Sequence, residues 1–241
     1  MERVVIRLLN VSFAYEKKER TLHSINLEFH PGLTLLLGPN GCGKSTLLKL
    51  ASGVEMPDSG TITINGYDLW KEEVEARKSL AYLPEHPDLT PYATIKEILN
   101  LVCRIRGEPL DHGKKALEFF GIQHLAHRTV RELSLGQRCQ AVFAACLVGT
   151  PSEVLLDEPL EGMDRHAQKE ILGWIKNLMN LGATVVVVSH TIEPFIQMAT
   201  EAVTLQSGWA FRFKELPASY DEKRSLLEQL AEGAFLLSLK S

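Results

Sequence analysis

Three observations predict an α/β fold with an N-terminal antiparallel β subdomain and an inserted helical subdomain. Apolar residues between positions 3 and 29 alternate in short runs, which is typical of antiparallel strands. Continuous apolar runs at 33–37 and 183–188 are typical of strands that are buried on both faces in a parallel sheet. Residues 86–149 contain no strand-like run, and their apolar residues recur at helix spacing. The sequence therefore indicates an α/β core that is interrupted by a helical insertion.

With 241 residues, 45% of them hydrophobic, the chain is long enough to form one large domain. We expect this domain to comprise an α/β core of residues 1–85 and 150–213. A helical subdomain is expected at 86–149, and a tail at 214–241.

The first strands are expected to form two or three antiparallel partners around a charged turn, E-K-K-E-R at 16–20. Tyr15 directly precedes this turn. An exposed aromatic ring at that position can stack on an adenine base. Alternatively, Tyr15 packs on the sheet as an edge-strand residue, and both interpretations remain open.

A glycine-rich segment follows the expected strand at 33–37 and matches the pattern G-x-x-x-x-G-K-S/T. Its glycines allow the backbone to approach a polyphosphate, and its N–H groups point at the phosphate oxygens. Lys44 would reach the β- and γ-phosphates, the Ser45 hydroxyl would ligate Mg²⁺, and Thr46 would assist. An accidental glycine-rich turn is the alternative, but a strand pattern before the segment and a helix pattern after it favour phosphate binding. The segment consists of Gly38, Pro39, Asn40, Gly41, Cys42, Gly43, Lys44, Ser45 and Thr46.

The next elements are expected to be a short helix, which ends before the break at 56–60, and two strands at 61–64 and 79–83. The second strand ends in P-E-H-P, which contains Glu85. Thr94 then opens a helix, because Glu97 stands three residues later as in a capping box. Two further helices are expected around 116–120 and after 134–136.

Strand character returns with V-L-L-D-E-P at 154–159. In open α/β sheets, ligands bind at the carboxyl ends of such strands. Asp157 would hold the magnesium ion, directly or through water, and Glu158 would orient and deprotonate the attacking water. The alternative is that both carboxylates merely end the strand or face solvent.

A helix at 171–179, stopped by Gly182, precedes the strand at 183–188. His190 follows this strand, so we expect its imidazole at the same sheet edge as Glu158 and Lys44, within reach of a γ-phosphate. A hairpin at 203–213 and an amphipathic helix around 226–230 complete the chain, and the tail has no functional interpretation.

Composition narrows the class of protein. No apolar run approaches the roughly 20 residues that span a bilayer, and the N-terminus has no apolar segment typical of a signal peptide. We therefore expect a chain that is neither secreted nor membrane-spanning. The net charge of -4 gives no basic footprint, which argues against nucleic acid as the main partner.

Four cysteines, at 42, 103, 139 and 146, show no C-x-x-C spacing, which favours a reducing compartment. Cys139 and Cys146 lie seven residues apart on an expected helix, so we expect both on one buried face. His124 and His127 are three residues apart, and a solvated pair is expected there rather than a metal site.

Taken together, the motifs resemble those of the ATP-binding subunits of ABC transporters, from Val4 to about Phe213. The sequence L-S-L-G-Q at 133–137 is similar to the L-S-G-G-Q signature of that family, and G-M-D at 162–164 is similar to its D-loop. His190 resembles the family's switch histidine, and Tyr15 its adenine-stacking aromatic residue.

The resemblance implies a P-loop NTPase (RecA-like) core that binds ATP and Mg²⁺, with catalytic roles for Lys44, Glu158 and His190. It also implies a head-to-tail dimer, of two copies or of two different subunits. In that dimer, each ATP is enclosed between the phosphate loop of one subunit and the signature of the other. Magnesium ligands would be Ser45, Asp157 and Glu85. Further nucleotide contacts would come from Ser134, Gly136, Gln137 and Asp164.

Three positions depart from the family pattern: Leu135 replaces a glycine, Glu85 replaces the Q-loop glutamine, and Gln140 stands where arginine is common. None of them affects the catalytic residues, so we expect a competent ATPase. Leu135 lessens the freedom of the backbone near the nucleotide, although Gly136 is retained. The carboxylate of Glu85 can still bind magnesium or water, but its charge alters the local electrostatics.

The resemblance implies that a separate membrane-spanning permease uses the motion of the dimer, so that this chain would act at the cytoplasmic face of the membrane. The helical subdomain and the loop at 85–94 would form the docking surface. A soluble clamp of the same superfamily, such as an iron–sulfur assembly factor, is the main alternative. A kinase with the same phosphate loop is a third, but it has no use for the signature or the D-loop.

Overall fold

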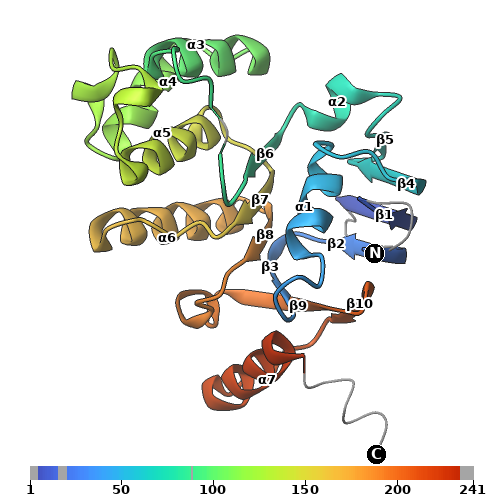
Figure 1. Ribbon diagram of the computed structural model, residues 1–241. Coiled ribbons are helices and arrows are strands. Elements are labelled where there is room, and N and C mark those ends of the chain that lie inside the picture. Colours follow the sequence, from blue (N-terminus) through green and yellow to red (C-terminus); the bar gives the residue numbers. More distant parts are fainter. Residues whose placement is uncertain (1–4, 16–20, 88, 234–241) are drawn as a thin grey trace, which may run out of the picture.

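The computed structural model of the protein describes residues 5–15, 21–87 and 89–233, and it contains two β-sheets with helices around them (Figure 1). The smaller sheet is antiparallel with strand order β2-β1-β4-β5. Its strands are β1 (Ile6–Phe13), β2 (Leu22–Phe29), β4 (Ser59–Ile64) and β5 (Tyr67–Asp68). The described part of the region expected to hold two or three N-terminal strands therefore contains two, and the charged turn at 16–20 lies outside the described residues.

The larger sheet has strand order β10-β9-β3-β8-β7-β6. The pairs from β9 to β6 are parallel, and only the β9–β10 hairpin is antiparallel. Every residue of β7 and β8 is buried, as their continuous apolar sequences predict. The strands are β3 (Gly32–Leu37), β6 (Leu80–Leu83), β7 (Glu153–Asp157), β8 (Thr184–Val188), β9 (Ala199–Gln206) and β10 (Trp209–Phe213).

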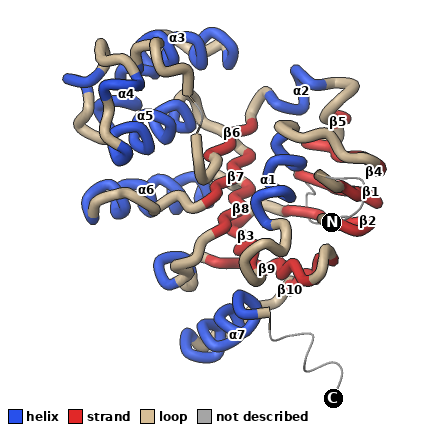
Figure 2. Tube along the Cα trace, viewed as in Figure 1, coloured by secondary structure: helices blue, strands red, loops and turns tan. Residues whose placement is uncertain are grey.

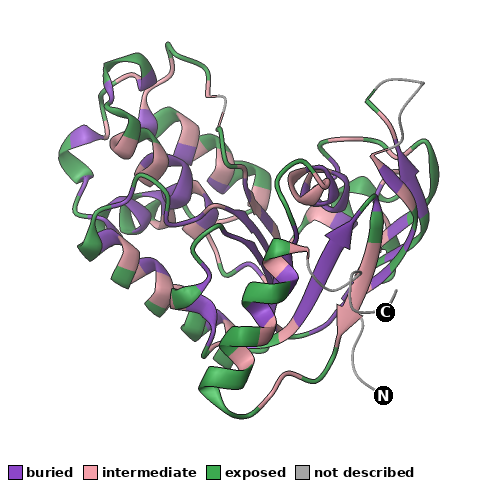
Figure 3. Ribbon diagram, turned by 60° about the horizontal axis from the view of Figure 1, so that its bottom comes forward, coloured by how far each residue is buried: buried purple, intermediate pink, exposed green. Residues whose placement is uncertain are grey.

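Helices cover both faces of the larger sheet (Figure 2). Helix α1 (Lys44–Ser52) lies between the two sheets, where Leu47, Leu48 and Leu50 join a cluster with side chains from both. Helix α6 (Arg165–Asn180) and helix α7 (Tyr220–Glu232) contribute to a second cluster on the opposite face. Figure 3 shows that buried residues concentrate on the strands and on the inward faces of the helices.

The block after β6 is helical, as expected, and lies beside the end of the sheet that β6 forms (Figure 1). It contains α3 (Ile95–Arg106), α4 (Asp111–Phe119), α5 (Leu135–Leu147) and the short 3₁₀ turns Gln123–Leu125 and Val130–Glu132. Thr94 caps α3 in the expected capping box with Glu97. A single bridge between Thr94 and Thr129 is the only β pairing within the described part of this block.

The expected helices and strands are confirmed, while five short elements of the described chain have no counterpart in the sequence patterns. These are β5, α2 (Glu73–Arg77) and the 3₁₀ turns Gln123–Leu125, Val130–Glu132 and Glu193–Phe195. The expectation that Cys139 and Cys146 share a buried face is wrong for Cys139. Cys146 is buried, but Cys139 is only half-buried because it lies at the start of α5, beside a cavity. His124 and His127 are both exposed.

Candidate functional site

The parallel strands bring the polar residues that follow them to one edge of the sheet. Leu83 pairs with Leu156, and Asp157 pairs with Val188, so β6, β7 and β8 end side by side. The phosphate loop follows β3 at the same edge, which is where open α/β sheets bind ligands.

The phosphate loop has a backbone that requires glycine at two places. Gly38 has a φ of 133°, and the Leu205 carbonyl occupies the space where a side chain would begin. Gly43 has a φ of 105° and forms the N-cap of α1. Lys44 Nζ donates to the carbonyls of Gly38 at 2.8 Å and Pro39 at 3.1 Å. The lysine therefore lies over its own loop, where its charge faces an incoming polyphosphate.

Asp157 ends β7 as a buried carboxylate with only 2% of its surface exposed. Burial raises its pKa, while a hydrogen bond from the Ser45 hydroxyl opposes that shift. Among the described residues, Asp157 Oδ1 has no hydrogen-bond partner. A buried carboxylate oxygen of this kind, next to a hydroxyl, fits a hard divalent cation such as Mg²⁺.

Glu158 turns out of the strand with a φ of 51°, in the left-handed region that non-glycine residues seldom adopt. Its carboxylate accepts hydrogen bonds from the Ser189 hydroxyl at 3.2 Å and from the His190 backbone N–H at 2.8 Å. The His190 imidazole Nε2 lies 3.7 Å from Glu158 Oε1. Burial is the main cause that raises the pKa of Glu158, as suits a proton acceptor.

A cavity of about 550 Å³ joins these groups. Tyr15 lies at its rim, 56% exposed, with its ring edge-on to Phe13 and its hydroxyl 3.3 Å from Thr46 Oγ1. Of the phosphate-loop residues expected to bind nucleotide, Gly38, Pro39 and Cys42 do not line the cavity. The lining consists of Tyr15, Thr21, Asn40, Gly41, Gly43, Lys44, Ser45, Thr46, Glu85, Asp157, Glu158, Val188 and His190.

The expected signature and D-loop residues lie outside this cavity. Ser134 caps α5, accepting a hydrogen bond from the Gln137 N–H at 3.3 Å, and Gln137 Oε1 accepts one from the Ser134 N–H. Asp164 caps α6 through the Ala167 N–H at 2.8 Å. The structure therefore does not bring these residues to the phosphate loop of the same chain.

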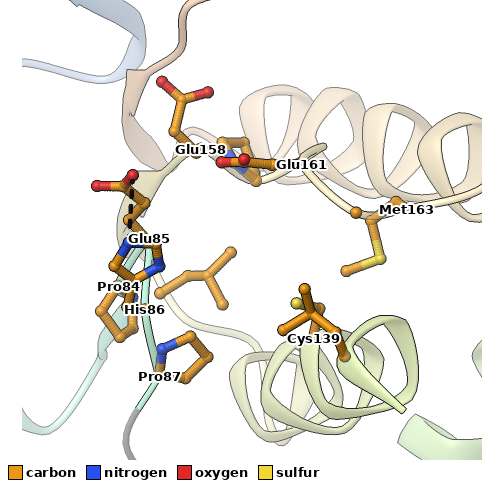
Figure 4. A pocket seen from close by; sticks show the side chains of 12 residues that line it. Pro84, Glu85, His86, Pro87, Cys139, Glu158, Glu161 and Met163 are labelled. Atoms are coloured by element: carbon orange, nitrogen blue, oxygen red, sulfur yellow. Dashed lines mark ion pairs between the residues drawn. The ribbon is translucent and has the colours of Figure 1, made fainter.

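A second, smaller cavity connects the two regions. Figure 4 shows Glu85 and Glu158 on one side of it, with Cys139 and Met163 on the other. Leu135 and Gly162 also line it, so the start of α5 and the segment after Glu158 share this space. Glu85 and Glu158 are thus common to both cavities.

Three residues at the site were not expected from the sequence. Ser189 supports Glu158 through its hydroxyl, and Thr21 and Val188 line the larger cavity. Ser189 could have been identified from the sequence, because it directly precedes His190 at the end of a strand. No pattern identifies Thr21, because its position depends on the packing of the two sheets.

The fold and this site define a P-loop nucleotide-binding protein. A family model described as ABC transporter matches residues 22–161. The chain therefore belongs to the ABC transporter family.

Similar proteins agree with that assignment. The chain is 34% identical over 215 residues to the sulfate/thiosulfate import ATP-binding protein of Pectobacterium atrosepticum, covering 85% of this chain and 64% of that protein. It is 30% identical over 233 residues to the spermidine/putrescine import ATP-binding protein of Spiroplasma citri, covering 94% and 66%. A dimeric bacterial ABC transporter cassette has the same fold, with a TM-score of 0.79, 24% identity, and coverage of 89% of this chain and 100% of that chain.

The chain spans less than two thirds of the length of several curated relatives, 64% in Pectobacterium atrosepticum and 54% in Synechocystis. In the described part of the chain, no helix combines the length and the apolar character needed to cross a membrane.

Proposed function

We propose that this chain is the ATP-hydrolysing motor subunit of an ABC transporter. The observation that carries this proposal is the meeting of Lys44, Asp157 and Glu158 in one cavity at the sheet edge. Lys44 would bind the β- and γ-phosphates. Glu158, held by Ser189 and the His190 N–H, would accept a proton from the attacking water.

The residues around Asp157 would hold Mg²⁺, with Ser45 and Asp157 as ligands and Glu85 as a further one. When bound there, magnesium would supply positive charge to neutralise the phosphate oxygens. His190, with 61% of its side chain exposed, is free to turn from Glu158 toward a γ-phosphate. Tyr15 would stack on the base.

We further propose that two ATP-binding subunits pair head-to-tail, either two copies of this chain or this chain and a related one. Ser134 lies at an exposed helix N-terminus outside its own phosphate cavity. In a head-to-tail pair, the partner's ATP would receive its hydroxyl and the backbone N–H of Gly136, and the side chain of Gln137 would lie beside it. Asp164 would contact the dimer interface.

A membrane-spanning permease would be the third component and would hold the chain at the cytoplasmic face of the membrane. Apolar side chains are exposed on the loop before α3 and on α3 itself: Tyr92 at 74%, Leu101 at 57% and Ile105 at 75%. Exposed apolar side chains of this kind suit contact with such a partner. The relatives described above are named for import, which favours this role over a soluble assembly factor.

Replacing Glu158 by glutamine tests the proposal. The amide cannot accept the proton, so Glu158→Gln should bind ATP with Mg²⁺, hydrolyse it at least about 100-fold more slowly, and accumulate as a dimer. Size-exclusion chromatography with light scattering measures the dimer, and phosphate release measures turnover.

Glu161→Gln is the matched control, since Glu161 lines only the smaller cavity, and it should not trap a dimer. Wild-type turnover by Glu158→Gln would refute the role of Glu158. A variant that remains monomeric in ATP and Mg²⁺, with and without a permease, would refute the composite site.

A further inference from the structure

The loop after β6 places a second carboxylate at the sheet edge where Asp157 lies. Leu83 at the end of β6 pairs with Leu156 of the parallel neighbour β7. Glu85 is two residues beyond Leu83, and Asp157 is one residue beyond Leu156. Since neighbouring strands lie about 4.8 Å apart, both carboxyl groups belong to one short stretch of the edge. Both line the phosphate cavity together with Ser45.

Asp157 supplies an independent sign of a ligand at this place. The residue as a whole is 98% buried and lines the cavity, and its Oδ1 atom is itself buried and finds no partner among the described residues. Native proteins leave few buried charged oxygens without a hydrogen bond or a metal. The unpaired oxygen, the Ser45 hydroxyl and a second carboxylate from Glu85 are all hard oxygen donors, which Mg²⁺ and Mn²⁺ prefer.

Among the described residues, neither nearby lysine contacts these carboxylates directly, and the histidine that pairs with Glu85 is exposed. Lys44 directs its ammonium to two carbonyls of its own loop. Lys49 lies one turn further along α1 and acts on Asp157 only through its charge. His86 pairs with Glu85 at 3.6 Å, but its side chain is 88% exposed and is easily displaced.

We propose that Glu85 and Asp157, with the Ser45 hydroxyl, form a divalent-cation site that fills before the nucleotide arrives. This inference rests on the proposed function, because it concerns the metal of the same site. A glutamine at position 85 would leave the ion one carboxylate, so that binding would depend on the phosphates of ATP.

We expect the proposed site to bind its divalent cation with moderate affinity. No trio of His, Cys, Asp or Glu within the described ranges is arranged to hold a metal ion. The protein therefore supplies two carboxylates and one hydroxyl, and water completes the coordination shell, as is usual for Mg²⁺.

The same charge has an opposite effect on the bare nucleotide. Without a divalent ion, the carboxylate of Glu85 repels the phosphates of ATP, so it should weaken binding of metal-free ATP. Glu85 thus imposes an order, in which the cation binds first and the nucleotide second. Replacing Glu85 by glutamine should therefore weaken binding of the free cation and strengthen binding of metal-free ATP. General damage to the site would weaken the binding of both.

Mn²⁺ titration of the nucleotide-free protein, followed by electron paramagnetic resonance, tests the proposal. We expect one site in the wild type, with at least about tenfold weaker binding in Glu85→Gln and none detectable in Asp157→Asn. Glu161→Gln removes the same charge from the smaller cavity alone and should bind Mn²⁺ like the wild type. With EDTA present, Glu85→Gln should bind ATP several-fold more tightly than the wild type.

Equal Mn²⁺ affinity in wild type and Glu85→Gln, or no binding to the nucleotide-free wild type at millimolar Mn²⁺, would overturn the inference. The proposed function would stand if either protein still bound Mg²⁺-ATP and hydrolysed it. It would fail separately if the wild type bound Mn²⁺ but neither bound nor hydrolysed ATP.

Discussion

At the scale of single residues, two adjacent carboxylates acquire different roles from their surroundings. Asp157 belongs to β7, is buried, and keeps an oxygen atom without a partner. Glu158 adopts a φ of 51°, which turns its carboxylate to the hydrogen-bond donors of Ser189 and His190. One residue of spacing therefore separates the proposed cation ligand from the proposed proton acceptor.

The buried charge of Asp157 lowers the stability of the folded protein at neutral pH. Because burial raises the pKa of Asp157 above its unfolded value, the protonated carboxyl favours the folded state at low pH. That stability is lost as pH rises through the raised pKa and the carboxyl becomes charged. Asp157→Asn should therefore raise the Tm of the protein without metal or nucleotide at pH 7, by roughly 2–4 °C. The gain should shrink toward acid pH, where the wild-type carboxyl is protonated.

Thermal melts between pH 4.5 and pH 8 measure this dependence. Asp68→Asn is the control of opposite sign, because the N–H groups of Trp70 and Lys71 lower the pKa of Asp68, and that variant should not gain stability. A lower Tm for Asp157→Asn at pH 7, or a gain that is the same at every pH, would contradict the explanation.

At the scale of elements, sequence patterns predict most of the fold because one physical rule dominates each segment. The β-branched run of β8 is buried on both faces, and the apolar positions of α3 follow the helix period. The phosphate loop was predictable for the same reason, since its glycines and lysine act locally. By contrast, β5 is two residues long and α2 is five, too short for a period to appear.

Contacts between distant segments were not predictable from local patterns. The tail at 214–241 had no functional interpretation, yet Leu227 and Leu230 of α7 are fully buried against the sheet. The Thr204 hydroxyl also donates to the Leu230 carbonyl at 3.0 Å. The support of Glu158 by Ser189 likewise depends on β7 and β8 being neighbours, which no single segment reveals.

Arg106 illustrates such a contact between elements. Helix α5 ends at Leu147, and its C-cap residue Val148 is extended and makes no capping hydrogen bond, so the last carbonyls of the helix need other donors. The Arg106 guanidinium, at the end of α3, donates to the carbonyls of Val148 at 2.5 Å and of Ala145 at 3.3 Å. It also reaches the Leu80 carbonyl of β6 at 3.3 Å. One side chain thus joins two helices of the helical block to the sheet.

Arg106→Ala should lower the free energy of unfolding by about 2–3 kcal/mol, because it leaves several part-buried carbonyls without donors. Arg106→Lys should recover only part of the loss, since an ammonium lacks the planar fork. Urea unfolding measures the change. Arg104→Ala, on an exposed position of the same helix, should cost less than about 0.5 kcal/mol. An equal cost at both positions would show that the guanidinium contacts contribute nothing specific.

At the scale of the whole molecule, the proposed function assigns one chain two half-sites that belong to different ATP molecules. Its phosphate loop lies at the sheet edge, and its signature lies at the start of α5, outside that cavity. The smaller cavity lies between them and is lined by residues of both regions. If the proposed roles hold, such a chain would reach a complete site only by pairing with a second subunit.

This arrangement predicts complementation between two inactive variants when the second subunit is another copy. Lys44→Ala removes the phosphate contact of one half-site, and Ser134→Arg blocks the signature half. Alone, each variant forms dimers in which both composite sites are defective. In a mixed dimer, the intact phosphate loop of one chain faces the intact signature of the other, so one site of two is restored. Random mixing of equal amounts makes half of the dimers mixed, and phosphate release should reach about one quarter of the wild-type rate. ADP binding by Ser134→Arg, through its own phosphate loop, verifies that this variant is folded. A mixture no more active than its separate components would show that each chain does not contribute one half of a neighbour's site.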